Sequence, residues 1–475
     1  MALRSGSFEV HQATPQTSHD RIRMKDLTNG SIAGHLLWMA VPTGAGMLLQ
    51  TLYFFVDLYF VAELGGAAVA GVSAAGNVTL IFFALTQVLG IGTVTLISHA
   101  IGRRDHQDAN LIFNQSLLLA GLSGVVALIV GYTLSVPYLR LVAADEAMVM
   151  QGRDYLYWFL PGMALQFAMV SMISALRGMG NVKPAIIVQT ATVLFNIVLT
   201  PVLIAGWGAG HPMGVAGAGL ASSIAVLGGV ALLWLYFNRV ERYISFHPHQ
   251  WRPRFYVWSR TLKIGLPAGG ELLLIFGYTS ITFLAISDFG PSAQAGFAIA
   301  SRVMHGIFLP ALAIAVVVAP VAGQNFGARQ LGRVRETFRV ASLQSIGIMF
   351  AAMLLCQWQA EAMVRFFSPD GVAVRVGTQY LQLISWTFAF SGMTLVCSGV
   401  FQALGNTLPS LVSSVMHLLV YGVSATWLTS QSEYKLEHVW YVSIAGTVLQ
   451  AALIGAWLRK HLRLWLGSST SPQPA

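Results

Sequence analysis

Residues 40–66 read AVPTGAGMLLQTLYFFVDLYFVAELGG, and residues 265–291 read GLPAGGELLLIFGYTSITFLAISDFGP. The separation between Pro42 and Pro267 equals the separation between Gly65 and Gly290, and we call it the repeat interval. The largely apolar segment between each proline and glycine has about 20 residues, the length that an α-helix needs to cross a lipid bilayer. The two stretches therefore predict a membrane-crossing helix that occurs twice in the chain.

The repeat interval recurs far beyond these two segments. Glycine makes up 47 of the 475 residues, so the Arg, Tyr, Asn and Pro matches carry more weight than the glycine matches. The further pairs at this interval are Gly102/Gly327, Arg104/Arg329, Arg140/Arg365, Gly152/Gly377, Tyr155/Tyr380, Gly180/Gly405, Asn181/Asn406 and Pro184/Pro409. Agreement at a single interval over this length indicates an internal duplication.

The composition indicates that the whole chain is a membrane protein. Hydrophobic residues make up 55% and charged residues only 9% of the chain, against about 25% charged residues in soluble domains. Helices are the open-chain structure that satisfies its own backbone polar groups inside a bilayer. The predicted spans are 35–62, 69–99, 111–135, 154–176, 184–206, 214–237, 264–288, 294–321, 340–360, 377–401, 409–428 and 438–458.

The predicted membrane topology explains why the chain carries a formal charge of +9, because the basic residues gather on one side of the membrane. When the N-terminus is placed in the cytoplasm, 21 of the 27 Lys and Arg residues fall on the cytoplasmic side, five fall on the other side, and Arg302 lies within a span. This bias predicts that both chain ends are cytoplasmic. A basic soluble domain is not predicted, so we expect no nucleic-acid partner. The N-terminal segment before the first span lacks the apolar core of a signal peptide or a span.

These observations predict an all-α polytopic membrane protein with twelve transmembrane helices in two six-helix lobes. Because each half has an even number of spans, the lobes share one orientation and are related by a pseudo-twofold axis along the membrane normal, with a cavity expected between them. The expected divisions are an N-terminal cytoplasmic tail at 1–31, an N-lobe at 32–237, a cytoplasmic linker at 238–263, a C-lobe at 264–458 and a second cytoplasmic tail at 459–475.

Several motifs, taken in order, resemble the multidrug and toxic compound extrusion (MATE) transporters, in their DinF-like or NorM-like branch. The resemblance covers about residues 34–457. Its motifs are Val41-Pro42 followed by Gln50, Tyr53 and Asp57; Gly65; Gly102-Arg103-Arg104-Asp105; Ala175-Leu176-Arg177-Gly178-Met179-Gly180-Asn181 before Pro184; Asn196; and Gly323-Gln324-Asn325-Phe326-Gly327-Ala328.

The resemblance implies a cation-coupled antiporter of the bacterial inner membrane that exports amphipathic organic cations by alternating access. The alternative is a lipid-linked precursor or polysaccharide flippase of the same superfamily, although flippases tend to have a cationic cavity for phosphates. The zinc-protease and serine-hydrolase motifs do not occur in the sequence, so we expect no enzyme. We expect membrane lipid as a neighbour, a monomeric protein, and no cofactor besides the coupling ion, H⁺ or Na⁺.

Asp57 is the best-placed carboxylate among the predicted spans. A carboxylate near the middle of the membrane costs about 2.5 to 3.5 kcal/mol, so it usually faces a cavity and has a function. Gln50, Tyr53, Phe54 and Asp57 are spaced i, i+3, i+4 and i+7, and so share one helix face. In the resemblance this face lines the substrate and cation region of the N-lobe. Ordinary interhelix packing is the alternative interpretation.

Asn196, Thr200 and Ser222 add neutral oxygen groups in the fifth and sixth spans. In the DinF-like branch the position four residues after the asparagine is often a second aspartate, whereas this chain has Thr200. Hard cations accept amide and hydroxyl oxygens, so Na⁺ at Asp57, Asn196 and Thr200 remains open, with Ser222 as a further coupling residue. The smaller charge favours H⁺ over Na⁺. A structural role around Pro201 is the alternative for Asn196 and Thr200.

Glu271 is the second acidic residue well inside a predicted span. The NorM-like branch has a glutamate eight residues after Pro267, where this chain has Ile275, and Glu271 is one helical turn earlier. Glu271 is therefore a candidate substrate-binding residue of the C-lobe. The alternative is a carboxylate that is stabilised by the dipole of a helix N-terminus. Arg302 and His417 are further polar groups within spans, and their roles stay open.

Overall fold

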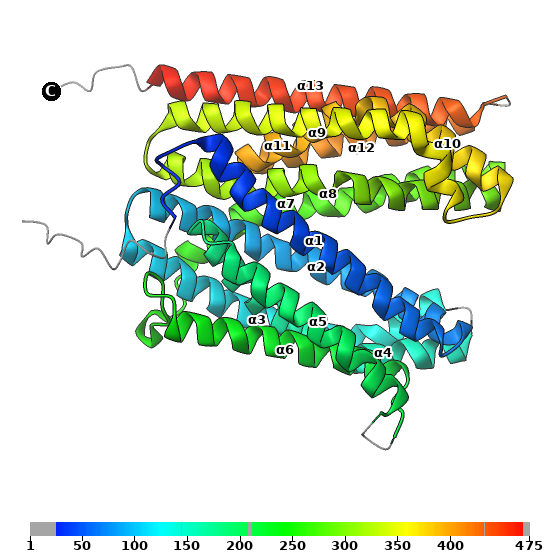
Figure 1. Ribbon diagram of the computed structural model, residues 1–475, viewed down its shortest axis with the longest axis horizontal. Coiled ribbons are helices and arrows are strands. Elements are labelled where there is room, and N and C mark those ends of the chain that lie inside the picture. The colour runs from blue at the N-terminus through cyan, green and yellow to red at the C-terminus, as the bar shows by residue number, and fades with distance from the viewer. Residues whose placement is uncertain (1–24, 144, 208–210, 432, 469–475) are drawn as a thin grey trace, which may run out of the picture.

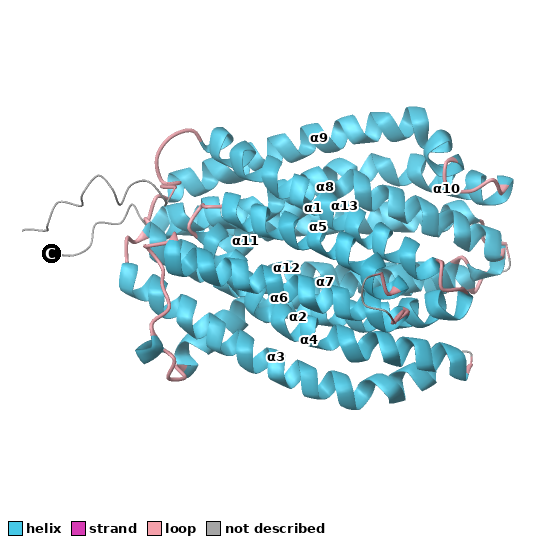
Figure 2. Cartoon of the chain, turned by 60° about the horizontal axis from the view of Figure 1, so that its bottom comes forward, coloured by secondary structure: helices cyan, strands magenta, loops and turns pink. Residues whose placement is uncertain are grey.

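The computed structural model describes residues 25–143, 145–207, 211–431 and 433–468, with only the backbone described for 53–58 and 465–468. Over these ranges the chain is helical and has no strand (Figure 2). The helices are α1 Ile32–Ala62, α2 Gly66–Gly102, α3 His106–Val142, α4 Glu146–Gly178, α5 Lys183–Ala205, α6 Val215–Arg239, α7 Phe255–Ala285, α8 Pro291–Gly327, α9 Leu331–Arg365, α10 Gly371–Ile384, α11 Phe388–Ala403, α12 Leu408–Thr429 and α13 Leu436–Ser468.

The described residues form twelve segments that are long and apolar enough to cross a membrane. This number confirms the twelve predicted spans. The tenth segment combines α10, the short 3-10 helix η4 (Ser385–Thr387) and α11. Two further 3-10 helices, η2 (Pro248–Gln250) and η3 (Ser287–Phe289), lie in the connections on either side of α7.

The backbone repeats the duplication that the sequence predicts. Arg104 and Arg329, which are separated by the repeat interval, both have a φ of 59°, in the left-handed region that only a few per cent of non-glycine residues occupy. Gly180 and Gly405 both have a φ of 75°. Helices α1–α6 therefore form one half of the molecule and α7–α13 the other, as the colours in Figure 1 show.

The first helix of each half begins within the other half. Leu36 and Met39 of α1 lie in an apolar cluster with side chains of α8 and α11. Val257 and Ile264 of α7 lie in a cluster with side chains of α2 and α3. This packing explains why α7 begins at Phe255, inside the stretch 238–263 that was predicted to be a linker.

The connections between helices gather at the two ends of the bundle. We call one of them the basic end; it contains the segments 25–31, 103–105, 179–182, 240–254, 328–330 and 404–407 and the last turns of α13. Figure 1 shows the helices of the two halves close together at the basic end and farther apart at the opposite end. The contacts between the halves described below lie at the basic end.

The connection between α6 and α7 is bound to α3 along much of its length. Asn110 donates to the carbonyl oxygen of Tyr243 over 3.1 Å and accepts from the amide of Ser245 over 2.9 Å. Asn114 accepts from the amide of His247 and from the indole Nε1 of Trp251, over 2.9 and 3.0 Å. Because α3 belongs to the first half, this connection is attached to that half.

Candidate functional site

Three of the predicted coupling residues form a hydrogen-bond chain between α5 and α6. Thr200 donates from Oγ1 to Oδ1 of Asn196 over 3.0 Å, and Asn196 donates from Nδ2 to Oγ of Ser222 over 3.1 Å. All three residues are at most 3% exposed. Residues four apart on a helix lie on one face, so the spacing of Asn196 and Thr200 predicted their closeness but not the bond between them. The structure brings in Ser222.

Gln50 of α1 contacts the same face of α5. Gln189 donates from Nε2 to Oε1 of Gln50 over 3.2 Å, and it lies seven residues before Asn196 on α5. Helices α1 and α5 both run from the basic end to the opposite end. Position 57 lies seven residues after Gln50 on α1, just as Asn196 lies seven residues after Gln189 on α5. Because the two helices run in parallel, the backbone at 57 lies at the level of Asn196.

Tyr53, Phe54 and Asp57 lie in α1. Their side chains are outside the part of the chain that the structure describes. The shared face that was predicted for Gln50, Tyr53, Phe54 and Asp57 therefore stays a prediction for three of its four residues.

Glu271 lies in the other half, on α7, and has serine partners. Ser398 of α11 donates to Oε1 of Glu271 over 2.8 Å, and Ser414 of α12 donates to the same oxygen over 3.5 Å. Gln450 of α13 in turn donates to Ser414 over 3.0 Å. The structure thus places Glu271 in a separate polar cluster and not with Asn196, Thr200 and Ser222.

The duplication relates these two polar regions. Thr282 and Tyr421 follow Asp57 and Asn196 by the repeat interval, and their side-chain oxygens are 2.9 Å apart in a hydrogen bond. Ser414, the partner of Glu271, follows Gln189 by the same interval.

The polar residues that sequence reasoning missed are Gln189, Ser398, Ser414 and Gln450. The repeat interval, applied to Gln189, is the signal that could have found Ser414.

Other polar groups of the described chain lie outside these two clusters. Arg302 is exposed on α8, and His417 stacks on Tyr278 inside the second half, with 5.7 Å between ring centroids. The described residues contain no group of three or more His, Cys, Asp or Glu side chains that could hold a metal ion.

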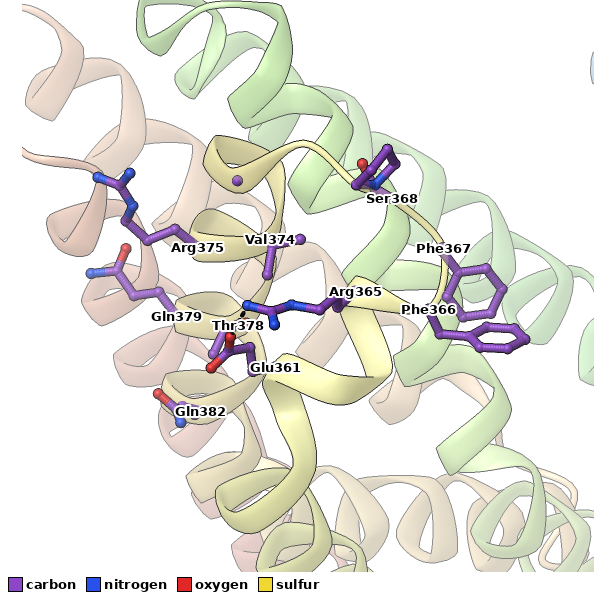
Figure 3. A pocket seen from close by; sticks show the side chains of 12 residues that line it. Glu361, Arg365, Phe366, Phe367, Ser368, Val374, Arg375, Thr378, Gln379 and Gln382 are labelled. Atoms are coloured by element: carbon purple, nitrogen blue, oxygen red, sulfur yellow. Dashed lines mark hydrogen bonds and ion pairs between the residues drawn. The ribbon is translucent and has the colours of Figure 1, made fainter.

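A pocket of about 950 Å³ lies away from all predicted site residues, at the end opposite the basic end. Figure 3 shows Glu361 and Arg365 at the end of α9 facing each other across an ion pair, and Arg375 and Gln379 on α10. Both ends of this ion pair are exposed. The pocket is a surface feature of the second half and contributes nothing to the site.

The chain was compared with known proteins. It matches the family model MatE over residues 42–202 and 267–428, two segments whose starting positions are separated by the repeat interval. It is 29% identical over 413 residues to the probable multidrug resistance protein YpnP of Bacillus subtilis, covering 85% of this chain and 90% of that protein. It is 23% identical over 435 residues to the multidrug export protein MepA of Staphylococcus aureus, covering 90% and 94%.

The fold is also similar to a solved one. The chain aligns with a crystal structure of MATE in the bent conformation with a TM-score of 0.87 and 23% sequence identity, over 94% of this chain and 98% of that one. The arrangement of the twelve candidate membrane helices among the described residues is therefore that of a known fold.

Proposed function

The chain belongs to the MatE family, and on that premise we propose that it is a proton-coupled antiporter that exports amphipathic organic cations by alternating access. It is a multi-pass membrane transporter of the multidrug-export type and not an enzyme. The relatives named for multidrug resistance and export support drug export over the flippase alternative.

The observation that carries the proposal is the buried chain of Thr200, Asn196 and Ser222 at the level of position 57. The corresponding positions of the second half, Thr282 and Tyr421, bond directly to each other, which supports placing Asp57 next to Asn196. One carboxylate can be neutralised either by a proton or by the positive charge of a bound cation, but not by both at once. A cationic substrate favours the charged form. Asp57 can therefore exchange the proton for the substrate.

The single carboxylate beside Asn196 and Thr200 favours H⁺ as the coupling ion. Oδ1 of Asn196 already accepts the hydroxyl proton of Thr200, and Nδ2 already donates to Ser222. Oδ1 of Asn196 and Oγ1 of Thr200 each keep a lone pair that a sodium ion could bind, but Asp57 would be the one carboxylate to balance its charge. A proton on Asp57 neutralises that carboxylate without any further acidic group.

The substrate class follows from the acidic and aromatic groups. We assign Gln50, Tyr53, Phe54 and Asp57 to the substrate region of the N-lobe, where aromatic rings offer apolar and cation–π contacts. Glu271, held by Ser398 and Ser414, supplies the acidic group of the C-lobe. One carboxylate in each lobe, among otherwise neutral polar groups, favours cations and disfavours anions.

The charge distribution supports a cytoplasmic basic end. Of the described Lys and Arg residues outside the spans, most lie at this end, and the exceptions Arg140, Arg153, Arg365, Arg375 and Lys435 lie at the opposite end. We therefore propose that residues 1–31, 238–263 and 459–475 lie on the cytoplasmic side of a bacterial inner membrane, in a protein that works as a monomer surrounded by lipid.

The test is efflux of a fluorescent organic cation from cells that produce Asp57→Asn. We expect the variant to be expressed and inserted but to lose efflux that is driven by a pH gradient. Asp154→Asn is the matched control, because Asp154 is exposed and paired with Arg153 near the end of the bundle. Undiminished efflux by Asp57→Asn would show that another group couples transport.

A further inference from the structure

Among the side chains that join the halves at the basic end, two, one from each half, make equivalent bonds. His99 of α2 donates from Nε2 to the carbonyl oxygen of Ala403, the last residue of α11, over 2.6 Å. Gln324 of α8 donates from Nε2 to the carbonyl oxygen of Gly178, the last residue of α4, over 2.9 Å. Carbonyls in the last turn of a helix have no partner within that helix. Each bond therefore satisfies a helix end that belongs to the other half.

The two bonds are the same contact made twice. The two donors are separated by the repeat interval, and so are the two acceptors. The backbone around them repeats as well, because a Cβ at Gly102 would overlap the carbonyl oxygen of Gln324 and a Cβ at Gly327 would overlap that of His99. Helices α2 and α8 thus approach each other closely, and the glycines make room for both bonds.

Both donors are buried, with His99 8% exposed and Gln324 not exposed at all. Water therefore does not replace either bond while the halves stay together. When the halves separate, α2 has to leave α11 and α8 has to leave α4, so both bonds break in that motion. The two bonds therefore oppose opening of the basic end, but they do not oppose motions within one half.

The two donor side chains differ in their other contacts. Oε1 of Gln324 accepts from the amide of Leu27 over 3.0 Å, and Asn325 donates to the carbonyl oxygen of Leu27 over 3.1 Å. Leu27 is completely buried. His99 instead packs against Phe326, with 5.0 Å between ring centroids. Among the described residues before α1, Leu27 therefore supports Gln324 through a hydrogen bond.

We propose that His99 and Gln324 are the gate pair of this transporter: their hydrogen bonds hold the basic end closed, and the strength of these bonds sets how often that end opens. The proposal rests on the alternating access of the proposed function, but not on Asp57 or on the coupling ion. Neither residue belongs to the substrate or coupling groups named above. The gate pair acts by positioning the lobes.

The test measures the separation of the lobes directly. Spin labels are placed at the exposed positions Gln107 and Glu336, one in each half near the basic end, after replacement of the buried free cysteines Cys356 and Cys397 by alanine. The distance distribution is recorded for purified protein in lipid nanodiscs, without substrate or ion gradient. The result is therefore independent of whether Asp57→Asn abolishes efflux.

The variants separate the hydrogen bond from the shape of the side chain. His99→Phe and Gln324→Leu keep bulk but remove the donor, and we expect each to raise the long-distance population about fivefold, the effect of one net hydrogen bond. His99→Gln should retain the parental distribution, because a glutamine makes the same bond at position 324. Parental distributions in both donor-free variants would overturn the proposal, as would an open distribution in His99→Gln.

A second variant guards against misfolding. The exchange variant H99Q/Q324H keeps a donor at both positions, and we expect it to give the parental distribution even if His99→Phe does not fold. An open distribution in this exchange variant, at a parental thermal unfolding temperature, would contradict the assignment of the gate to these two bonds.

Discussion

Thr200 is the residue at which we test proton against sodium coupling. Its hydroxyl donates to Asn196 and is fully buried. We expect Thr200→Asp to make efflux depend on sodium at fixed pH, because a second carboxylate beside Asn196 supplies the charge that a hard cation needs. Efflux of a fluorescent cation in sodium and potassium buffers measures this change.

Thr200→Asn is the control for this prediction, since it changes the side chain without adding charge. We expect it to stay independent of sodium. Sodium-dependent efflux by the unmodified protein would reverse the preference for H⁺. An unchanged ion dependence in a well-expressed Thr200→Asp would place the cation elsewhere.

Tyr53 tests the substrate region separately from coupling. We expect Tyr53→Ala to reduce resistance to some cationic dyes more than to others, because it removes an aromatic wall and leaves Asp57 in place. Resistance to a panel of dyes and substrate-driven proton exchange are the two measurements. Equal loss for every dye together with lost proton exchange would assign Tyr53 to coupling, and no effect would place it against neighbouring helices.

At the scale of elements, the connection between α6 and α7 is bound to α3 and does not act as a free tether. Asn114 accepts from His247 and Trp251 and donates to the carbonyl oxygen of Ser245 over 3.0 Å. We expect Asn114→Ala to cost about 1–3 kcal/mol of stability, the range for buried groups left unpaired. The connection should also become a better trypsin substrate.

Thermal unfolding and the rate of cleavage at Arg242 and Arg254 measure this effect. Gln107→Ala serves as the control, because Gln107 is exposed on the same helix. Equal cleavage rates for Asn114→Ala and the control would mean that the apolar contacts of the connection, and not its hydrogen bonds, attach it to the first half.

At the scale of the whole molecule, the basic residues predict its orientation. We expect a cysteine at His249, exposed in the connection between the halves, to react with a membrane-impermeant maleimide only in broken cells. A cysteine at Ser430, exposed at the opposite end, should react in intact cells. The reverse pattern would invert the proposed topology.

The sequence predicted the fold because its signals are local or repeated. Twelve apolar stretches need only their own length and composition to be recognised, and the structure has twelve such helices among its described residues. The duplication needed only one interval, which recurs in the paired φ angles of Arg104 and Arg329. The spacing of Asn196 and Thr200 likewise lies within a single helix, where geometry follows from residue number.

Contacts between helices could not be predicted from the sequence. The sequence predicted that Glu271 lies inside a span, but its partners Ser398 and Ser414 come from α11 and α12, far along the chain. The bond between Gln50 and Gln189 and the attachment of residues 243–254 to α3 also join distant segments. A hydrogen bond of this kind depends on how two helices cross, and no local pattern records the crossing.

By itself, then, the sequence determined that this chain crosses the membrane twelve times, is built of two related halves and carries its few membrane carboxylates at positions 57 and 271. Hydrophobicity and helical periodicity act along the chain, so the order of residues suffices for these properties. Only the tertiary structure decided that the first helix of each half packs into the other half, and that His99 and Gln324 reach across to helix ends of the opposite half. Those contacts arise from the close packing of helices that are far apart in sequence, where a glycine at position 102 or 327 matters only because another backbone lies against it.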